Sequence, residues 1–126
     1  MPVPDTHNLR IDKGTDFSRV FTLKDSAGDA FDLTGYTVAA EAEDRTATVL
    51  GASNLDLSPS VTGAVTGEIT LSVTDTTTAA ISGVTEGLRD DEKPIYDLLI
   101  TKTSTGLTTK VAEGIVEVVA TTTTGT

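Results

Sequence analysis

Apolar and polar residues alternate along much of this 126-residue chain, and the alternation limits the fold more than any other feature. One face of each of the segments 17–23, 36–43, 67–73 and 95–102 is mostly apolar. A period of two is typical of a half-buried β-strand, because successive side chains of a strand point to opposite sides. Glycine, proline and aspartate mark turns at intervals of roughly ten residues, which predicts about seven to nine short strands.

The residue types agree with strands. Threonine makes up roughly a fifth of the chain, and branching at Cβ favours pleated backbone over helix. Short strands separated by regular turns are typical of a two-sheet sandwich. We therefore expect an all-β fold, an immunoglobulin-like β-sandwich with one short helix in a connection. The chain has no cysteine and no tryptophan, so the disulfide and the buried tryptophan that mark antibody domains are absent.

The two segments closest to the C-terminus carry the clearest strand patterns, and they predict a β-hairpin. Ile95 to Lys102 is apolar on both faces, which predicts a central strand. Leu107 to Ala120 also alternates, and Gly114 within it predicts a bulge or a close backbone approach. The residues predicted to lie in the core are Tyr96, Leu98, Ile100, Val111 and Ile115.

Three further local features are predicted. Asp25 to Asp29 has the composition of a hairpin loop. Gly35 is expected to have positive φ at a corner, since glycine alone adopts that region without strain. A short helix is predicted over Thr76 to Ser82, with Asp75 as its N-cap and Gly83 as its stop.

The chain is long enough for one domain, which we place at residues 8–120. Met1 to His7 contains two prolines and little periodicity, and Thr121 to Thr126 is a run of threonine followed by Gly-Thr. Both segments are predicted to be arms, which lack the apolar residues needed to offset their ordering entropy. Deleting either arm is therefore expected to leave the melting midpoint nearly unchanged.

Reactive chemistry has few residues available. The chain has no cysteine, which excludes disulfides and thiol chemistry. The single histidine, His7, lies in the predicted arm and is expected to be a solvated residue. Asp25, Asp29 and Asp32 do not have the alternating spacing of a calcium loop, and the charged stretch from Gly87 to Pro94 is expected to be a solvated turn. We expect no enzyme activity and no catalytic, cofactor-binding or metal-binding residue.

The formal net charge of −10 repels phosphate backbones and anionic lipid surfaces. Nucleic acid and membrane partners are therefore not expected. The N-terminus has no apolar run like that of a signal peptide, and no segment approaches the length of a membrane span. These features predict a soluble protein made in a cytoplasm.

The order of several short motifs resembles a known family. Ile11-Asp-Lys-Gly14, Asp32-Leu-Thr-Gly-Tyr36, Gly67-Glu-Ile-Thr-Leu-Ser72 and Glu113-Gly-Ile-Val-Glu-Val118 occur in the order seen in tailed-bacteriophage virion proteins. The chain is similar to the immunoglobulin-like N-terminal domain of phage baseplate upper proteins. The resemblance extends from about Asn8 to Val119.

This resemblance implies a structural role in a virion, with synthesis in the host cytoplasm. Domains of the family commonly anchor a longer fibre, whereas here only the threonine-rich segment follows the domain. A tail, baseplate or fibre-attachment adaptor is therefore expected, with a capsid decoration protein as the alternative. The expected partners are other virion proteins and further copies of the chain, held through terminal arms and sheet edges. A monomeric carbohydrate- or protein-binding module is a third hypothesis.

Overall fold

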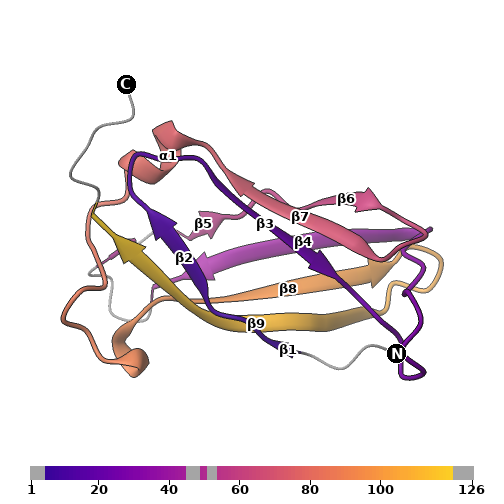
Figure 1. Cartoon of the computed structure of the whole chain (residues 1–126). Coiled ribbons are helices and arrows are strands. Elements are labelled where there is room, and N and C mark those ends of the chain that lie inside the picture. Colours follow the sequence, from indigo (N-terminus) through magenta and orange to yellow (C-terminus); the bar gives the residue numbers. More distant parts are fainter. Residues whose placement is uncertain (1–4, 45–48, 51–53, 121–126) are drawn as a thin grey trace.

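The computed structural model describes residues 5–44, 49–50 and 54–120, whose strands form two facing sheets (Figure 1). The larger sheet contains β1 (Asp5–Thr6), β2 (Leu9–Asp12), β4 (Tyr36–Glu43), β5 (Leu55–Asp56), β8 (Ile95–Lys102) and β9 (Thr108–Val119). The smaller sheet contains β3 (Phe17–Thr22), β6 (Ser60–Gly63) and β7 (Glu68–Val73). Helix α1 (Asp75–Ala79) follows β7, and the 3-10 turn η1 (Asp90–Glu92) precedes β8.

The order of the strands defines the fold. In the larger sheet β9, β8, β4 and β5 are successive neighbours, and β1 and β2 pair in parallel with β9. The smaller sheet has the order β3-β7-β6. With β3 as strand B, these are the G-F-C-C′ and B-E-D orders of immunoglobulin domains. The chain is therefore an all-β immunoglobulin-like sandwich, and the predicted fold is confirmed.

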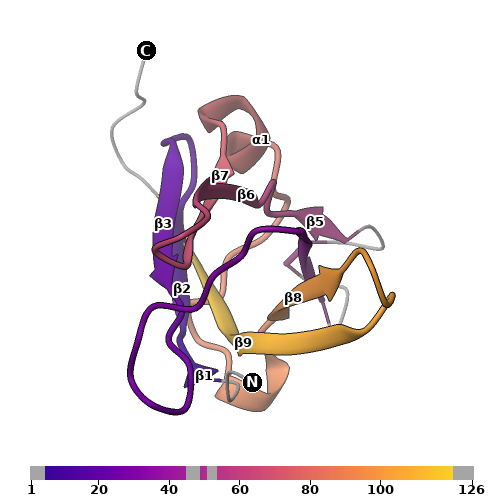
Figure 2. The ribbon, with the colours of Figure 1, turned by 90° about the vertical axis from the view of Figure 1, so that its right-hand side faces the viewer.

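The core lies between the two sheets and is built from the inward side chains of their strands. Figure 2 views the sandwich end-on, with β3, β7 and β6 on one side and β8 and β9 on the other. The predicted central position of β8 is confirmed, since it pairs with both β4 and β9. The predicted core residues that are buried are Tyr96, Leu98, Ile100 and Val111.

Ile115 was predicted to lie in the core, and this was wrong. The register between β8 and β9 shifts after Leu98, so that Val111 is an extra residue in β9. An extra residue reverses the side to which the following side chains point. Val111 and Ala112 are therefore both buried, whereas Ile115 falls on the outer face of the sheet and is half-buried.

The first described residues belong to the sandwich, so the predicted boundary of the N-terminal arm at His7 was wrong. β1 pairs with β9, and the His7 amide donates to the Glu113 carbonyl at 2.9 Å. The chain then crosses Gly114, where a Cβ atom would lie 2.8 Å from the His7 carbonyl carbon. The close approach predicted at Gly114 is thus confirmed. Residues 1–4 and the predicted C-terminal arm, 121–126, lie outside the described residues.

The helix is shorter than predicted. It ends at Ala79, and its N-cap is Thr74, whose side chain accepts a hydrogen bond from the Thr77 amide. After Ala79 the amides of Ala80 and Ile81 bond to carbonyls three residues back, and Ser82 and Gly83 then both donate to the Val49 carbonyl, so the chain leaves the helix before Ser82. Gly83 does not have positive φ, so the predicted left-handed stop was wrong.

The helix packs through one threonine rather than through alanine. Ala79 and Ala80 are exposed, whereas Thr78 and Ile81 are buried. The Thr78 hydroxyl donates to the Thr15 carbonyl at 2.8 Å and accepts from the Gly14 amide at 3.0 Å. These bonds hold the helix against the turn between β2 and β3.

Two predicted turns are confirmed. Gly35 has φ of +83° and precedes Tyr36 at the start of β4. In the turn after β3, Oδ1 of Asp25 accepts hydrogen bonds from the amides of Ala27 and Asp29, both at 3.0 Å. Each aspartate or glycine at these turns therefore has a local structural reason for its presence.

We predict that deleting residues 1–7 lowers the free energy of unfolding by about 1–3 kcal/mol, because the buried Tyr96 hydroxyl loses its acceptor. That hydroxyl donates to the His7 carbonyl. Denaturant unfolding of the full and shortened chains measures the change. In a Tyr96→Phe background the same deletion should cost less, because the hydrogen bond is already absent. Equal costs in the two backgrounds would contradict the prediction.

Candidate functional site

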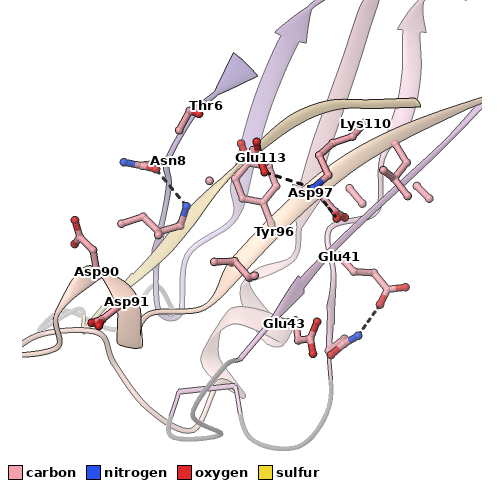
Figure 3. A pocket seen from close by; sticks show the side chains of 17 residues that line it. Thr6, Asn8, Glu41, Glu43, Asp90, Asp91, Tyr96, Asp97, Lys110 and Glu113 are labelled. Carbon is pink, nitrogen blue, oxygen red and sulfur yellow. Dashed lines mark hydrogen bonds and ion pairs between the residues drawn. The ribbon is translucent and has the colours of Figure 1, made fainter. Parts of the chain in front are cut away.

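The outer face of the larger sheet carries a shallow hollow of about 610 Å³ (Figure 3). Its lining comes from β4, β8 and β9, from the segment between β1 and β2, and from η1. This is the face directed away from the smaller sheet, so it takes no part in the core. A broad and open hollow on a sheet suits contact with another macromolecule better than enclosure of a small ligand.

A row of three carboxylates crosses this face. Glu41 on β4 lies opposite Asp97 on β8, and Asp97 lies opposite Glu113 on β9. Like charges directly opposite each other in a sheet are destabilising. The row therefore works against the stability of the isolated domain, and a cationic group that approached this face would relieve the repulsion.

Within the part of the chain that the structure describes, the charge of the row is only partly balanced. Lys110 Nζ lies 3.4 Å from Glu113 Oε1 and 4.0 Å from Asp97 Oδ2. Asn54 donates to Glu41 Oε2 at 3.1 Å and brings no charge. One lysine thus faces three carboxylates. Figure 3 shows Lys110 reaching towards Asp97 and Glu113 on one side of the hollow.

More acidic side chains lie at the ends of the hollow. Glu43 is exposed at the end of β4, and Asp90 and Asp91 project from η1. Arg89 lies 3.6 Å from Asp91, and Lys93 lies 3.2 Å from Asp90, so this end is better balanced than the row. Arg89 to Asp91 are exposed, as predicted for a solvated turn, whereas the Lys93 side chain is only 14% exposed and also lies 3.6 Å from Glu117 on β9.

Apolar side chains flank the carboxylate row on the floor of the hollow. Ile95 is 38% exposed, and Leu99 and Ile115 are half-buried. Ile95 and Ile115 lie opposite each other in register. The carboxylate row therefore runs between Leu99 on one side and the Ile95–Ile115 pair on the other, so that acidic and apolar groups lie side by side on this face.

Tyr96 lies beneath the floor and links β8 to the segment between β1 and β2. Its ring is buried in the core, and its hydroxyl reaches the His7 carbonyl over Gly114, its opposite residue on β9. Burial raises the pKa of Tyr96 to about 12, with Glu113 adding to the effect and Arg19 opposing it. The phenol is neutral at physiological pH and serves as a hydrogen-bond donor.

This raised pKa predicts a loss of stability in alkali. The stability contributed by neutral Tyr96 is fully present below about pH 10 and is lost as the pH rises towards the folded pKa of about 12. Urea unfolding between pH 8 and 11.5 should therefore show a steeper decline for the natural chain than for Tyr96→Phe. Parallel declines would contradict the prediction. The difference between the two chains is the relevant quantity, because lysines titrate in the same range.

The residues considered for metal or acid-base chemistry do not form a site. His7 is half-buried, with its ring edge on Phe21 at a centroid distance of 5.6 Å, so the prediction that it is solvated was wrong. Asp32 accepts the Thr34 amide at 2.9 Å, and this hydrogen bond lowers the pKa of Asp32. Within the part of the chain that the structure describes, no group of acidic or histidine side chains is arranged to hold a metal ion.

Comparison with known proteins adds little beyond the fold. No protein-family profile and no curated protein matches the sequence. Among solved structures, one similar chain comes from a photo-crosslinking study of multimeric cell-adhesive interactions of VGSC beta subunits. It has 12% identity and a TM-score of 0.47, and the match covers 94% of this chain and 96% of that one.

A second similar chain comes from the crystal structure of ICOS in complex with ICOS-L and an anti ICOS-L VNAR domain. Its identity is 14% and its TM-score 0.44, with 94% of this chain and 56% of that chain covered. The strand order of the two sheets, rather than these distant matches, defines the fold. None of the described helices is long and apolar enough to cross a bilayer.

Proposed function

We propose that this chain is a non-enzymatic structural protein of a tailed-phage virion, where it acts as an adaptor in the tail, at the baseplate or at the attachment of a fibre. The proposal is supported by the resemblance over residues 8–119 to the immunoglobulin-like domain of phage baseplate upper proteins. Several of the shared residues serve the sandwich itself, such as Gly35 at its corner and Gly114 at the strand crossing. Those residues therefore support the fold more than the virion role, and evidence for the role must come from surface residues.

The observation that carries the proposal is the outer face of the larger sheet. Its row of carboxylates and its apolar floor are costly features for an isolated domain, and both are suited to a protein partner. We propose that this face binds a neighbouring virion protein whose contact surface carries lysine or arginine side chains beside apolar ones. A partner of that kind would offset the repulsion among Glu41, Asp97 and Glu113.

The alternative of a carbohydrate-binding module is disfavoured by the aromatic residues. Sugar sites commonly present exposed aromatic rings, whereas Phe17, Phe21 and Tyr96 are buried and Phe31 and Tyr36 are partly buried. Capsid decoration remains an alternative, because the same face could bind a capsid protein. The position of the chain in the particle, on the capsid or on the tail, distinguishes the two roles.

Glu41→Lys tests the proposal in whole particles. We predict that this variant folds at least as stably as the natural chain, because a lysine in place of Glu41 removes the repulsion with Asp97 opposite it. Its occupancy in purified particles is nevertheless expected to fall several-fold. Glu86→Lys makes the same change of charge at an exposed loop residue outside the hollow and should be incorporated normally. Normal occupancy of Glu41→Lys would exclude this face, and absence of the natural chain from every particle would exclude the virion role.

A further inference from the structure

Strand β3 is an edge strand, and no described strand pairs with its outer side. It ends the smaller sheet on one side and is six residues long. Figure 2 shows it at one margin of the sandwich. The other three edges are less open to pairing. β1 and β5 have two residues each and β2 has four, while β6 follows Pro59 and has an irregular register between Val61 and Gly63. Val20, on the outer face of β3, is 51% exposed.

The backbone of β3 offers hydrogen-bonding groups at this edge. Leu23 donates to the Gly67 carbonyl at 2.8 Å, and the register of β3 with β7 continues from that pair without a break. Hydrogen-bonded and non-hydrogen-bonded pairs alternate in an antiparallel ladder. The odd-numbered residues of β3 therefore bond to β7, whereas the N–H and C=O groups of Ser18, Val20 and Thr22 point towards the open edge.

The side chains along the same edge are self-complementary. Reading every second residue from 16 to 24 gives Asp, Ser, Val, Thr and Lys, all exposed. If a second copy pairs antiparallel with Val20 opposite Val20, then Ser18 faces Thr22 and Asp16 faces Lys24 on both sides of the centre. Opposite charges and matched hydroxyls in these positions favour pairing. No like charges oppose each other on this face.

We propose that two copies of this chain associate through antiparallel pairing of their β3 strands, with Val20 at the two-fold axis. The inference rests on the proposed function in that it names one sheet edge through which copies would meet in a virion. Pairing joins the two smaller sheets into one continuous six-stranded sheet in the order β6-β7-β3-β3-β7-β6. Both acidic hollows remain uncovered, because they lie on the larger sheets and face the same side of the pair.

Sedimentation equilibrium of the purified full chain tests the association. The natural chain is expected to form dimers as its concentration rises. Val20→Lys places two ammonium groups at the axis and should raise the dimer dissociation constant about tenfold or more. Val65→Lys is the matched control, since Val65 is 71% exposed outside β3 and should leave the dimer intact. Equal dissociation constants for the two variants, or a natural chain that stays monomeric, would overturn the proposal.

Single cysteines test the register, since the natural chain contains none. Hydrogen-bonded residues in an antiparallel pair have Cα atoms about 5.5 Å apart, within disulfide range, so Val20→Cys should give a covalent dimer on oxidation. Ser18→Cys should link far more slowly, because its two copies lie about 14 Å apart along the strands. Equal rates for the two variants would refute pairing centred on Val20.

The two proposals fail separately. Dimers of the purified chain need no virion, so loss of the β3 contact in Val20→Lys is visible whether or not the chain enters particles. Conversely, the Glu41→Lys variant leaves β3 unchanged and should dimerise like the natural chain. A chain that dimerises through β3 but is absent from particles would retain this inference and remove the virion role.

Discussion

Replacing Leu98 with alanine is expected to lower the free energy of unfolding by about 2–5 kcal/mol. Leu98 is fully buried at the middle of β8, the central strand of the larger sheet. Its side chain occupies the core where antibody domains place a disulfide cysteine, two residues after a tyrosine. Packing around Leu98 must therefore supply part of the cohesion that a covalent link supplies in those domains.

Chemical denaturation of the Leu98→Ala variant measures this cost. Leu107→Ala removes the same atoms from a side chain that is 64% exposed, and it should change the free energy of unfolding by less than about 0.5 kcal/mol. If the two variants were equally stable, β8 would not be the centre of the core.

Gly67→Ala is expected to cost roughly 2–5 kcal/mol, because it combines backbone strain with overlap of atoms. Gly67 has φ of +74°, and a Cβ atom there would lie 2.5 Å from the Leu23 carbonyl oxygen and 2.8 Å from that of Phe31. Two backbone segments would have to move apart. The substitution therefore disturbs the point where the chain leaves β3 and passes the start of β7.

Gly106→Ala separates the two contributions. Gly106 has almost the same φ, +75°, but a Cβ atom there would meet nothing within 4 Å. Only the strain remains, and we expect a cost of about 1–2 kcal/mol. Thermal or denaturant unfolding of both variants gives the comparison. Equal losses at Gly67 and Gly106 would show that crowding at Gly67 is relieved without cost.

The sequence was sufficient for the strands because their signal is local. Alternation placed Ala40 and Ala42 of β4 and Ile69 and Leu71 of β7 on buried faces, and the structure agrees. It failed at Ile115, because a single extra residue in β9 reverses the faces that follow. Such a bulge depends on how two strands pair, which alternation within one strand does not specify.

The candidate site was missed for a related reason. Alternation assigns Glu41 to a polar face, but Asp97 lies in a segment predicted to be apolar on both faces, and Glu113 alternates in phase with Val111 and Ile115, which were predicted to be buried. Each of the three carboxylates also belongs to a different strand. Their alignment in one row follows from the register of β4 with β8 and of β8 with β9. Register between strands distant in sequence is a tertiary property. The N-terminal segment was misjudged similarly, since its partner β9 lies about a hundred residues away.

The parallel pairing of β2 with β9 gives the domain a mechanical property. The two strands run in the same direction over the pairs from Leu9 with Val116 to Asp12 with Val119. A pull that separates the N-terminal end of β2 from the C-terminal end of β9 therefore slides one strand along the other. The hydrogen bonds of the pair then bear the load together rather than opening one after another. A domain held at both ends within a larger assembly would resist extension through this pair.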